Sequence, residues 1–553
     1  MNHLPSIFSL SLLTMTAHAA VKPASIFADH MVLQRDQSVP VWGTADAGEA
    51  VTISFAGQTK TATADAKGHW LIKLDPMPAS AEPRVMVISN NLKTKIPNPK
   101  ISDVLVGEVW LASGQSNMGV PLSSAHNAAT ELPKANDAEL RFFTVTRATA
   151  AEPQLAMRGK WEASNPDTAK GFSAVAYFFA RELRAKLKCP VAVLHSSWGG
   201  TPAQAWVSMD ALREEPPLAA QVKKWEAALP KHLDVLAYPE KIVAYQRELK
   251  QWQNEVAPAF SAALKQYNAS KSTGPKPTPA RPEPSNPDPM GMPSPSARPG
   301  TPSVIFNAMI APLAPFAMRG AIWYQGEANG GAGLEYRTLL PRLIGDWRKH
   351  WQQGDFPFLF VQLPGWDHDT KPAAQHDWPW LREAQLLTLK SVPHTGMAVT
   401  IDIGNPKDVH PADKVDVGQR LALVARKIAY GESLVHSGPL YEGIAIEGAT
   451  VRVKFGDIGQ RLIVGQAPWL ADGVEPLPKN KLIGFTIAGD DKQWHEAEAK
   501  ITGDHIIVSS PEVTKPVAVR YGWANAPRCN LYNQEGLPAS PFRSDDWSLS
   551  GSH

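Results

Sequence analysis

The sequence predicts an α/β protein in which helices cover a parallel sheet and a β module lies on either side of it. Short alternating runs separated by Gly and Asp turns, between residues 39 and 88, are typical of a small β-sandwich. From Val104 longer apolar strands alternate with helical segments such as Ala174–Leu187, which indicates a parallel sheet with helices on its faces. From Leu440 the alternation returns without a helical period, which predicts a second β module.

Length and composition narrow the class of protein. The chain has 553 residues, enough for several domains. With 55 Lys and Arg against 53 Asp and Glu, it lacks the basic face that nucleic acid requires. A hydrophobic share of 43% and a charged share of 20% are typical of a soluble globular protein. The two cysteines, Cys189 and Cys529, exclude a disulfide scaffold but leave one long-range bridge open.

The N-terminus predicts export. An apolar run over Pro5–Met15 precedes Ala17–Ala19, the small-residue pattern of a signal-peptidase site, so residues 1–19 are interpreted as a cleaved signal peptide. No later stretch reaches the roughly 18 apolar residues of a membrane-spanning helix. We therefore expect a periplasmic or secreted protein with no membrane partner.

The changes in hydrophobic pattern along the chain predict three domains: an N-terminal β-sandwich over 20–100, an α/β domain over 101–431 and a C-terminal β module over 432–553. An insertion over 209–303 interrupts the α/β domain. Its first part has helix-like, charged sequence, and its second has eleven prolines between Lys271 and Pro302. Such a density of proline excludes regular helix and central strand, so the second part is interpreted as an extended linker or surface loop.

Candidate catalytic residues follow the expected strands, because ligands bind at the carboxyl edge of open parallel sheets. The first strand leads into Ser113–Met118, where a glycine before Gln115 permits a sharp turn that presents the hydroxyl and backbone N–H of Ser116. The second glycine of a nucleophile elbow is missing. Taken alone, Ser116 is more often simply a turn residue.

Two further strand ends offer groups for an anion. Gly199 and Gly200 follow the second strand and could present backbone N–H groups, although a plain tight turn explains them equally well. Gln325, Glu327 and Asn329 follow the third, where polar side chains are costly to bury unless they bond to each other or to a ligand.

The fourth strand ends before Asp408 and His410. In an extended segment residues two apart point the same way, so the carboxylate could orient the imidazole. A solvated turn is the plainer interpretation. A serine and a histidine at the same sheet edge, with two candidate oxyanion sites, nevertheless form a coherent acyl-transfer site.

Together these segments resemble the sialate O-acetylesterase-like branch of the SGNH (GDSL-type) hydrolases. Ser113–Met118, Trp198–Thr201, Trp323–Asn329 and Asp408–Pro411 look like the family's catalytic blocks. Ser25–Arg35 looks like its opening signature, and Ala518–Ala524, Asn530–Asn533 and Gly536–Ala539 look like its closing one. The resemblance spans nearly the whole expected mature chain except the Pro-rich insertion.

The resemblance implies a flavodoxin-like three-layer α/β/α hydrolase domain that removes O-acetyl groups from sugars. We expect no metal or other cofactor, because His, Asp and Glu do not cluster at zinc-ligand spacing in the sequence. Ser116 would be the nucleophile and His410 the base. For the oxyanion it implies the Ser116 N–H, an N–H of Gly199 or Gly200, and the Gln325 amide. Glu327 and Asn329 would support the site from behind.

The acid is the open question, because Lys407 occupies the place of the aspartate in the family's usual Asp-x-x-His pattern. Asp408 is the first candidate and Asp402 the rival. A serine–histidine dyad without a carboxylate would also be consistent.

The glycan is also open: acetylated sialic acid, or an acetylated plant glycan such as xylan or xyloglucan. Trp198 is a candidate platform for a neutral sugar, whereas Arg382 could bind the carboxylate of a sialic acid, unless its helical context makes it structural. The alternative of another class is a non-catalytic glycan-binding protein that uses its β modules.

Overall fold

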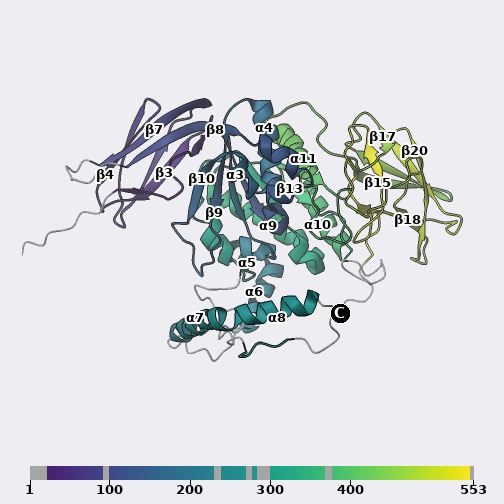
Figure 1. Ribbon diagram of the computed structural model, residues 1–553. Helices are drawn as coiled ribbons and strands as arrows, with labels where there is room; N and C mark the ends of the chain where they lie inside the picture. The colour runs from purple at the N-terminus through teal and green to yellow at the C-terminus, as the bar shows by residue number, and fades with distance from the viewer. Residues whose placement is uncertain are drawn as a thin grey trace, which may run out of the picture.

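The computed structural model describes residues 21–90, 99–228, 238–269, 277–282, 299–367 and 377–547. The expected signal peptide, residues 1–19, lies outside these ranges. A β region at the N-terminal end, a central α/β region and a β region at the C-terminal end follow one another across Figure 1, with α7 and α8 below the centre. None of the helices in the described ranges is both long and apolar enough to span a bilayer.

The N-terminal β region has two sheets. One contains β1 (Lys22–Pro23), β3 (Val39–Thr44) and β6 (His69–Leu74). The other joins β4 (Ala50–Phe55), β5 (Gln58–Thr63), β7 (Ser80–Asn90) and β2 (Val32–Gln34) to β8 (Lys100–Gly114). Burial alternates along β6, where Trp70, Ile72 and Leu74 are buried, as expected of strands with one face on a core.

The long strand β8 belongs to both the N-terminal sheet and the central sheet. Its first part pairs with β7 and β2, and its second part pairs with β11 (Val191–Ser197) and β12 (Gly320–Tyr324). The expected boundary at residue 100 therefore coincides with the start of a strand that the two regions share.

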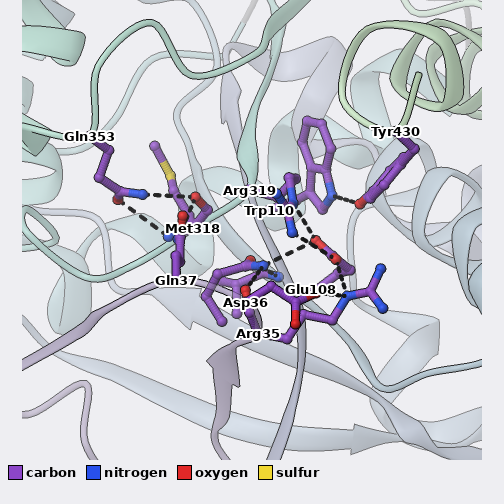
Figure 2. A network of polar contacts seen from close by, with 11 residues as sticks. Arg35, Asp36, Gln37, Glu108, Trp110, Met318, Arg319, Gln353 and Tyr430 are labelled. Carbon is purple, nitrogen blue, oxygen red and sulfur yellow. Dashed lines mark hydrogen bonds and ion pairs between the residues drawn. The ribbon is translucent and has the colours of Figure 1, made fainter. Parts of the chain in front are cut away.

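A buried carboxylate marks this junction (Figure 2). Glu108 of β8 is fully buried and contacts Arg35 from the opening signature and Arg319 at the start of β12. Burial opposes its ionisation, but Arg319 and Arg35 hold the pKa of Glu108 below its ordinary value. The opening signature thus contributes an ion pair that connects the N-terminal β region to the central sheet.

The central sheet has the strand order β10-β9-β11-β8-β12-β13-β14. The remaining strands are β9 (Asp137–Val145), β10 (Gly159–Ser164), β13 (Phe358–Gln362) and β14 (Thr395–Val399). All neighbours from β9 to β14 are parallel, and only β10 is antiparallel. The strands from β11 to β14 follow the 2-1-3-4-5 order of doubly wound flavodoxin-like sheets, in which ligands bind at the carboxyl edge.

Helices cover both faces of this sheet. The rings of Phe358 in β13 and Trp347 in α9 (Gly333–Trp351) lie 5.7 Å apart. The next residue, Leu359, lies with Gly396 against Val424 of α11 (Val415–Ile428) on the opposite face. Helix α4 (Ala174–Leu187) packs beside α11, and α10 (Trp378–Ser391) packs beside α9. The predicted mixed α/β architecture is confirmed.

The first part of the segment between β11 and β12 contains helices. It contains α5 (Met209–Glu214), α6 (Pro216–Ala228), α7 (Tyr238–Glu255) and α8 (Ala257–Ala269). Of the Pro-rich part, residues 277–282 and 299–302 are described and contain neither helix nor strand. The Trp252 indole of α7 donates a hydrogen bond to the Arg281 carbonyl at 2.8 Å, so this piece contacts the helical insertion.

Short helical turns connect the larger elements. They are α1 (Ser116–Gly119), η1 (Leu122–Ser124), α2 (Ala128–Glu131), η2 (Leu132–Lys134), α3 (Pro166–Lys170), η3 (Ala203–Trp206), η4 (Phe306–Ile310) and η5 (Glu327–Ala332).

From Leu440 to residue 547, the regular structure of the chain consists of β-strands. Its strands are β15 (Leu440–Glu447), β16 (Thr450–Gly456), β17 (Leu462–Val464), β18 (Phe485–Ala488), β19 (Trp494–Glu496), β20 (Glu498–Thr502), β21 (His505–Ser509), β22 (Ala518–Tyr521), β23 (Leu531–Asn533) and β24 (Phe542–Arg543). Cys189 and Cys529 are both free and buried, so the bridge left open by the sequence is not formed.

Candidate active site

Ser116 lies where β8 leaves the central sheet. Gly114 has a φ of 133° and a Cβ there would lie 2.1 Å from the Tyr324 carbonyl oxygen of β12, so only glycine fits this turn. The next residue, Gln115, donates its N–H to the same oxygen at 3.0 Å. Ser116 then begins helix α1, where the N–H has no acceptor within the helix.

His410 comes from the loop between β14 and α11 and meets Ser116. The distance between His410 Nε2 and Ser116 Oγ is 2.8 Å, within the range for proton transfer to a general base. The imidazole is partly exposed, at 43% of the side chain. Burial and the positive charge of Lys414 lower the pKa of His410, and Asp408 opposes this shift. The geometry thus brings together the two residues predicted to carry the chemistry.

The carboxylate predicted to orient His410 is not hydrogen-bonded to its ring. Asp408 Oδ1 lies 3.9 Å from His410 Nδ1, and it accepts the backbone N–H of His410 at 2.8 Å. This is a turn stabilised by a side chain rather than the extended segment assumed from the sequence. The expected hydrogen bond from the His410 ring to the Asp408 carboxylate is therefore not formed.

The rival carboxylate, Asp402, is occupied elsewhere. Its two oxygens accept from the Arg420 guanidinium at 2.6 and 2.7 Å, and the Tyr532 hydroxyl donates to it at 3.0 Å. Both charged side chains are almost fully buried, with exposed fractions of 2% for Asp402 and 6% for Arg420. Asp402 therefore belongs to a buried ion pair with α11.

The segment that follows β11 lies against the serine. A Cβ at Gly199 would lie 3.1 Å from the Ser116 Cβ, so this glycine lies directly against the serine. Gly200 has a φ of 72°, in the left-handed region that glycine favours. Within the described ranges the N–H groups of Ser116 and Gly199 are paired with no acceptor. Both are available to an oxyanion.

Gln325 has no amide hydrogen to offer an oxyanion. Its Nε2 donates to Asn329 Oδ1 at 2.8 Å and to the Thr201 carbonyl at 3.3 Å, and its Oε1 accepts from the Tyr336 hydroxyl at 2.8 Å. The predicted role of Gln325 is therefore wrong, because its burial forces it to satisfy its own polar atoms. Among the described residues, Asn329 Nδ2 donates only to Gln204 Oε1, at 3.1 Å, which leaves its second amide hydrogen available.

Behind the Ser116–His410 pair lies a buried cluster that includes two residues missed from the sequence, Asn117 and Lys414. Asn117 Nδ2 donates to Glu327 Oε1 at 2.5 Å and to the Val409 carbonyl at 2.8 Å, and its Oδ1 accepts from Lys414 Nζ at 2.6 Å. Their only signal in the sequence is closeness to Ser116 and His410. Glu327 accepts a hydrogen bond from Asn117 and is part of this cluster.

Arg382 is not available to a substrate. It is fully buried and donates to four carbonyl oxygens, those of Leu363, Pro364, Ala524 and Asn525, at 2.7 to 2.8 Å. It joins α10 to the C-terminal region, so its predicted binding role is wrong. Trp198 is half-buried and packs against the core.

A cavity of about 730 Å³ lies along the segment that follows β9. Arg147, Arg158 and Glu152 line it. The Arg147 Nε donates to the Ser197 carbonyl at 3.2 Å, next to the segment that carries Gly199. Within the described ranges its two Nη atoms have no partner. Ser116, Gly199 and His410 are not among the residues that line this cavity, so its guanidinium lies beside the segment that follows β11 rather than against the serine.

No group of three or more His, Cys, Asp and Glu side chains that could hold a metal ion occurs among the described residues.

Known proteins are similar to this chain over nearly its whole length. Over 94% of its length the chain is 30% identical to the sialate O-acetylesterase of Rattus norvegicus, of which it covers 93%. It is 28% identical to the sialate O-acetylesterase of Homo sapiens and covers 91% of it. The crystal structure of a carbohydrate acetylesterase from Xanthomonas citri superposes with a TM-score of 0.75 at 35% identity, covering 96% of this chain and 100% of that one. No protein-family model matches the chain.

The fold and these relatives define the class as carbohydrate esterases. Within that class, the chain belongs to the sialate O-acetylesterase-like family of carbohydrate acetylesterases, as the resemblance of its sequence blocks implied.

Proposed function

We propose that this protein is a secreted or periplasmic serine esterase that removes O-acetyl groups from carbohydrate. Its central region would be a three-layer SGNH hydrolase domain, which the parallel sheet with helices on both faces supports. The observation that carries the proposal is the distance of 2.8 Å between Ser116 Oγ and His410 Nε2 at the carboxyl edge of that sheet.

The proposed reaction has two steps. Ser116 Oγ attacks the acetyl carbonyl carbon while His410 Nε2 takes the hydroxyl proton, and the proton then passes to the departing sugar oxygen. This leaves an acetyl group on Ser116. Water, deprotonated by His410, attacks the acetyl-enzyme, and acetate leaves as the proton returns to Ser116. Charge on the carbonyl oxygen would be stabilised by the N–H groups of Ser116 and Gly199 and by the free amide hydrogen of Asn329.

In this site His410 acts with Ser116 as a dyad, and Asp408 contributes its charge from 3.9 Å. The alternative of a non-catalytic glycan-binding protein predicts no acetate release from any ester. Release of acetate from an aryl acetate that depends on Ser116 would exclude that alternative.

The protonation state of His410 should determine how the activity depends on pH. His410 must be neutral to accept the proton, and burial and Lys414 lower its pKa. Protonation, and with it the loss of kcat/KM, should therefore occur below the ordinary histidine value of about 6.5. The measurement is kcat/KM on an aryl acetate between pH 4 and 9. An acid limb centred above 6.5 would contradict the environment derived for His410.

The cavity that Arg147 lines leads to a prediction about acetylated sialic acid as a substrate. The unpaired Nη atoms of Arg147 could bind a carboxylate, so Arg147→Gln should lower kcat/KM on acetylated sialic acid by about tenfold or more. Acetate release from acetylated xylan or xyloglucan oligosaccharides should be unchanged. Lys160→Gln, a change at a side chain that is 78% exposed, is the matched control. Equal losses on both substrates, or none on sialic acid, would exclude Arg147 as the carboxylate's partner.

A further inference from the structure

The buried cluster behind Ser116 and His410 joins three segments that are distant in the sequence. Asn117 follows the serine on α1, Glu327 comes from the turn after β12, and Val409 and Lys414 come from the loop before α11. The residues at its centre, Asn117 and Lys414, are both fully buried. The side chain of Asn117 therefore connects the segment of the nucleophile to the segment of the base.

The partners of Asn117 fix which way its amide points. The Val409 carbonyl can only accept, so the Asn117 atom 2.8 Å from it is the amide nitrogen, which also donates to Glu327 Oε1. The amide oxygen then faces Lys414 Nζ, which donates to it at 2.6 Å. Val409 immediately precedes His410, so the hydrogen bond to its carbonyl fixes the backbone from which the imidazole reaches Ser116.

The cluster buries two ionisable side chains, Glu327 and Lys414. Glu327 Oε2 is buried without a hydrogen-bond partner among the described residues. Lys414 Nζ also lies 5.4 Å from the centre of the Tyr324 ring. Burial, offset in part by Glu327, Asp413 and Asp408, lowers the pKa of Lys414 to about 7. The charged groups that act on His410 are Lys414 and Asp408.

We propose that Lys414 is a positioning residue for the esterase reaction: through its hydrogen bond to Asn117 it holds the His410 loop against the Ser116 turn. This inference rests on the proposed Ser116–His410 chemistry. It gives a physical reason why this site can operate with Asp408 beyond hydrogen-bond distance from the ring.

The test is Lys414→Met, which keeps an unbranched side chain and removes the ammonium. Misplacement of the base should lower kcat by up to about 100-fold. KM for an aryl acetate should change little, because Lys414 does not contact the substrate. Loss of the positive charge should raise the pKa of His410, so the acid limb of kcat/KM should move to higher pH.

Two further variants separate positioning from mere structure. Lys407→Met removes a lysine from the exposed part of the same loop and should behave as wild type. Lys414→Met combined with Glu327→Gln removes both buried charges, so it should recover stability lost in the single variant without recovering kcat or the pH profile.

Two results would overturn the proposal: a Lys414→Met enzyme with the kcat and acid limb of Lys407→Met, or a double variant with a wild-type profile. The second would mean that Lys414 only neutralises Glu327. Ser116→Ala, assayed in parallel, keeps the two hypotheses apart. If wild type and Ser116→Ala release acetate equally, the proposed function is wrong. If wild type is active and Ser116→Ala is inactive, the proposed function stands, and the Lys414→Met result tests only the role of Lys414.

Discussion

Replacing either Ser116 or His410 by alanine should reduce kcat for acetate release by more than roughly 1000-fold. The reason is that Ser116 Oγ and His410 Nε2, 2.8 Å apart, form one catalytic unit in which neither acts without the other. The double variant should be no worse than either single, because losses within such a unit are not additive. Steady-state kinetics on an aryl acetate measures all three.

Stability should be almost unaffected by these changes, since both residues lie beyond their strands rather than within them. A melting temperature within a few degrees of wild type is the necessary control. Near-normal turnover in either single variant would remove that residue from the mechanism.

Replacing Asp402 by asparagine should destabilise the protein far more than it affects the chemistry. Its partner Arg420, 6% exposed, would lose the carboxylate that accepts two of its hydrogen bonds, and only the more distant charge of Asp416 would remain. Breaking a buried pair from one side costs about 3–5 kcal/mol. We expect a clear fall in melting temperature, while the folded enzyme at low temperature keeps most of its kcat.

Asp408→Asn is the matched comparison, since the Asp408 side chain is 56% exposed and 3.9 Å from the imidazole. It should leave the melting temperature unchanged and lower kcat by less than about tenfold, or roughly 1.4 kcal/mol of barrier. Loss of its charge should also lower the pKa of His410 further. A loss of several hundredfold would restore Asp408 as the acid of a triad.

The sequence could predict the Ser116–His410 pair because both residues follow strands of a parallel sheet, and such ends meet at one edge. It could not predict the acid in the same way. The inference from Asp408 assumed an extended chain, whereas the side chain folds back to accept the N–H of His410. A turn built by a side chain has no fixed two-residue period, so spacing alone misleads there.

Burial explains the other differences. Arg382 and Gln325 are chemically suited to a substrate, yet each is fully buried and directs its donors to protein oxygens. Lys414 and Asn117 were not predicted, because their importance arises only where three separate segments converge. Polar residues near a motif indicate a site, but which of them face the substrate depends on packing that no local pattern records.

The most direct test of the central claim is covalent labelling with a fluorophosphonate, which reacts with an activated serine. We predict that each molecule of wild-type enzyme takes up one label with loss of acetate release, and that peptide mass spectrometry finds the label on Ser116. Ser116→Ala and His410→Ala should remain unlabelled under the same conditions. An active wild-type enzyme that stays unlabelled, or carries the label on another residue, would contradict the assignment of Ser116 as the nucleophile activated by His410.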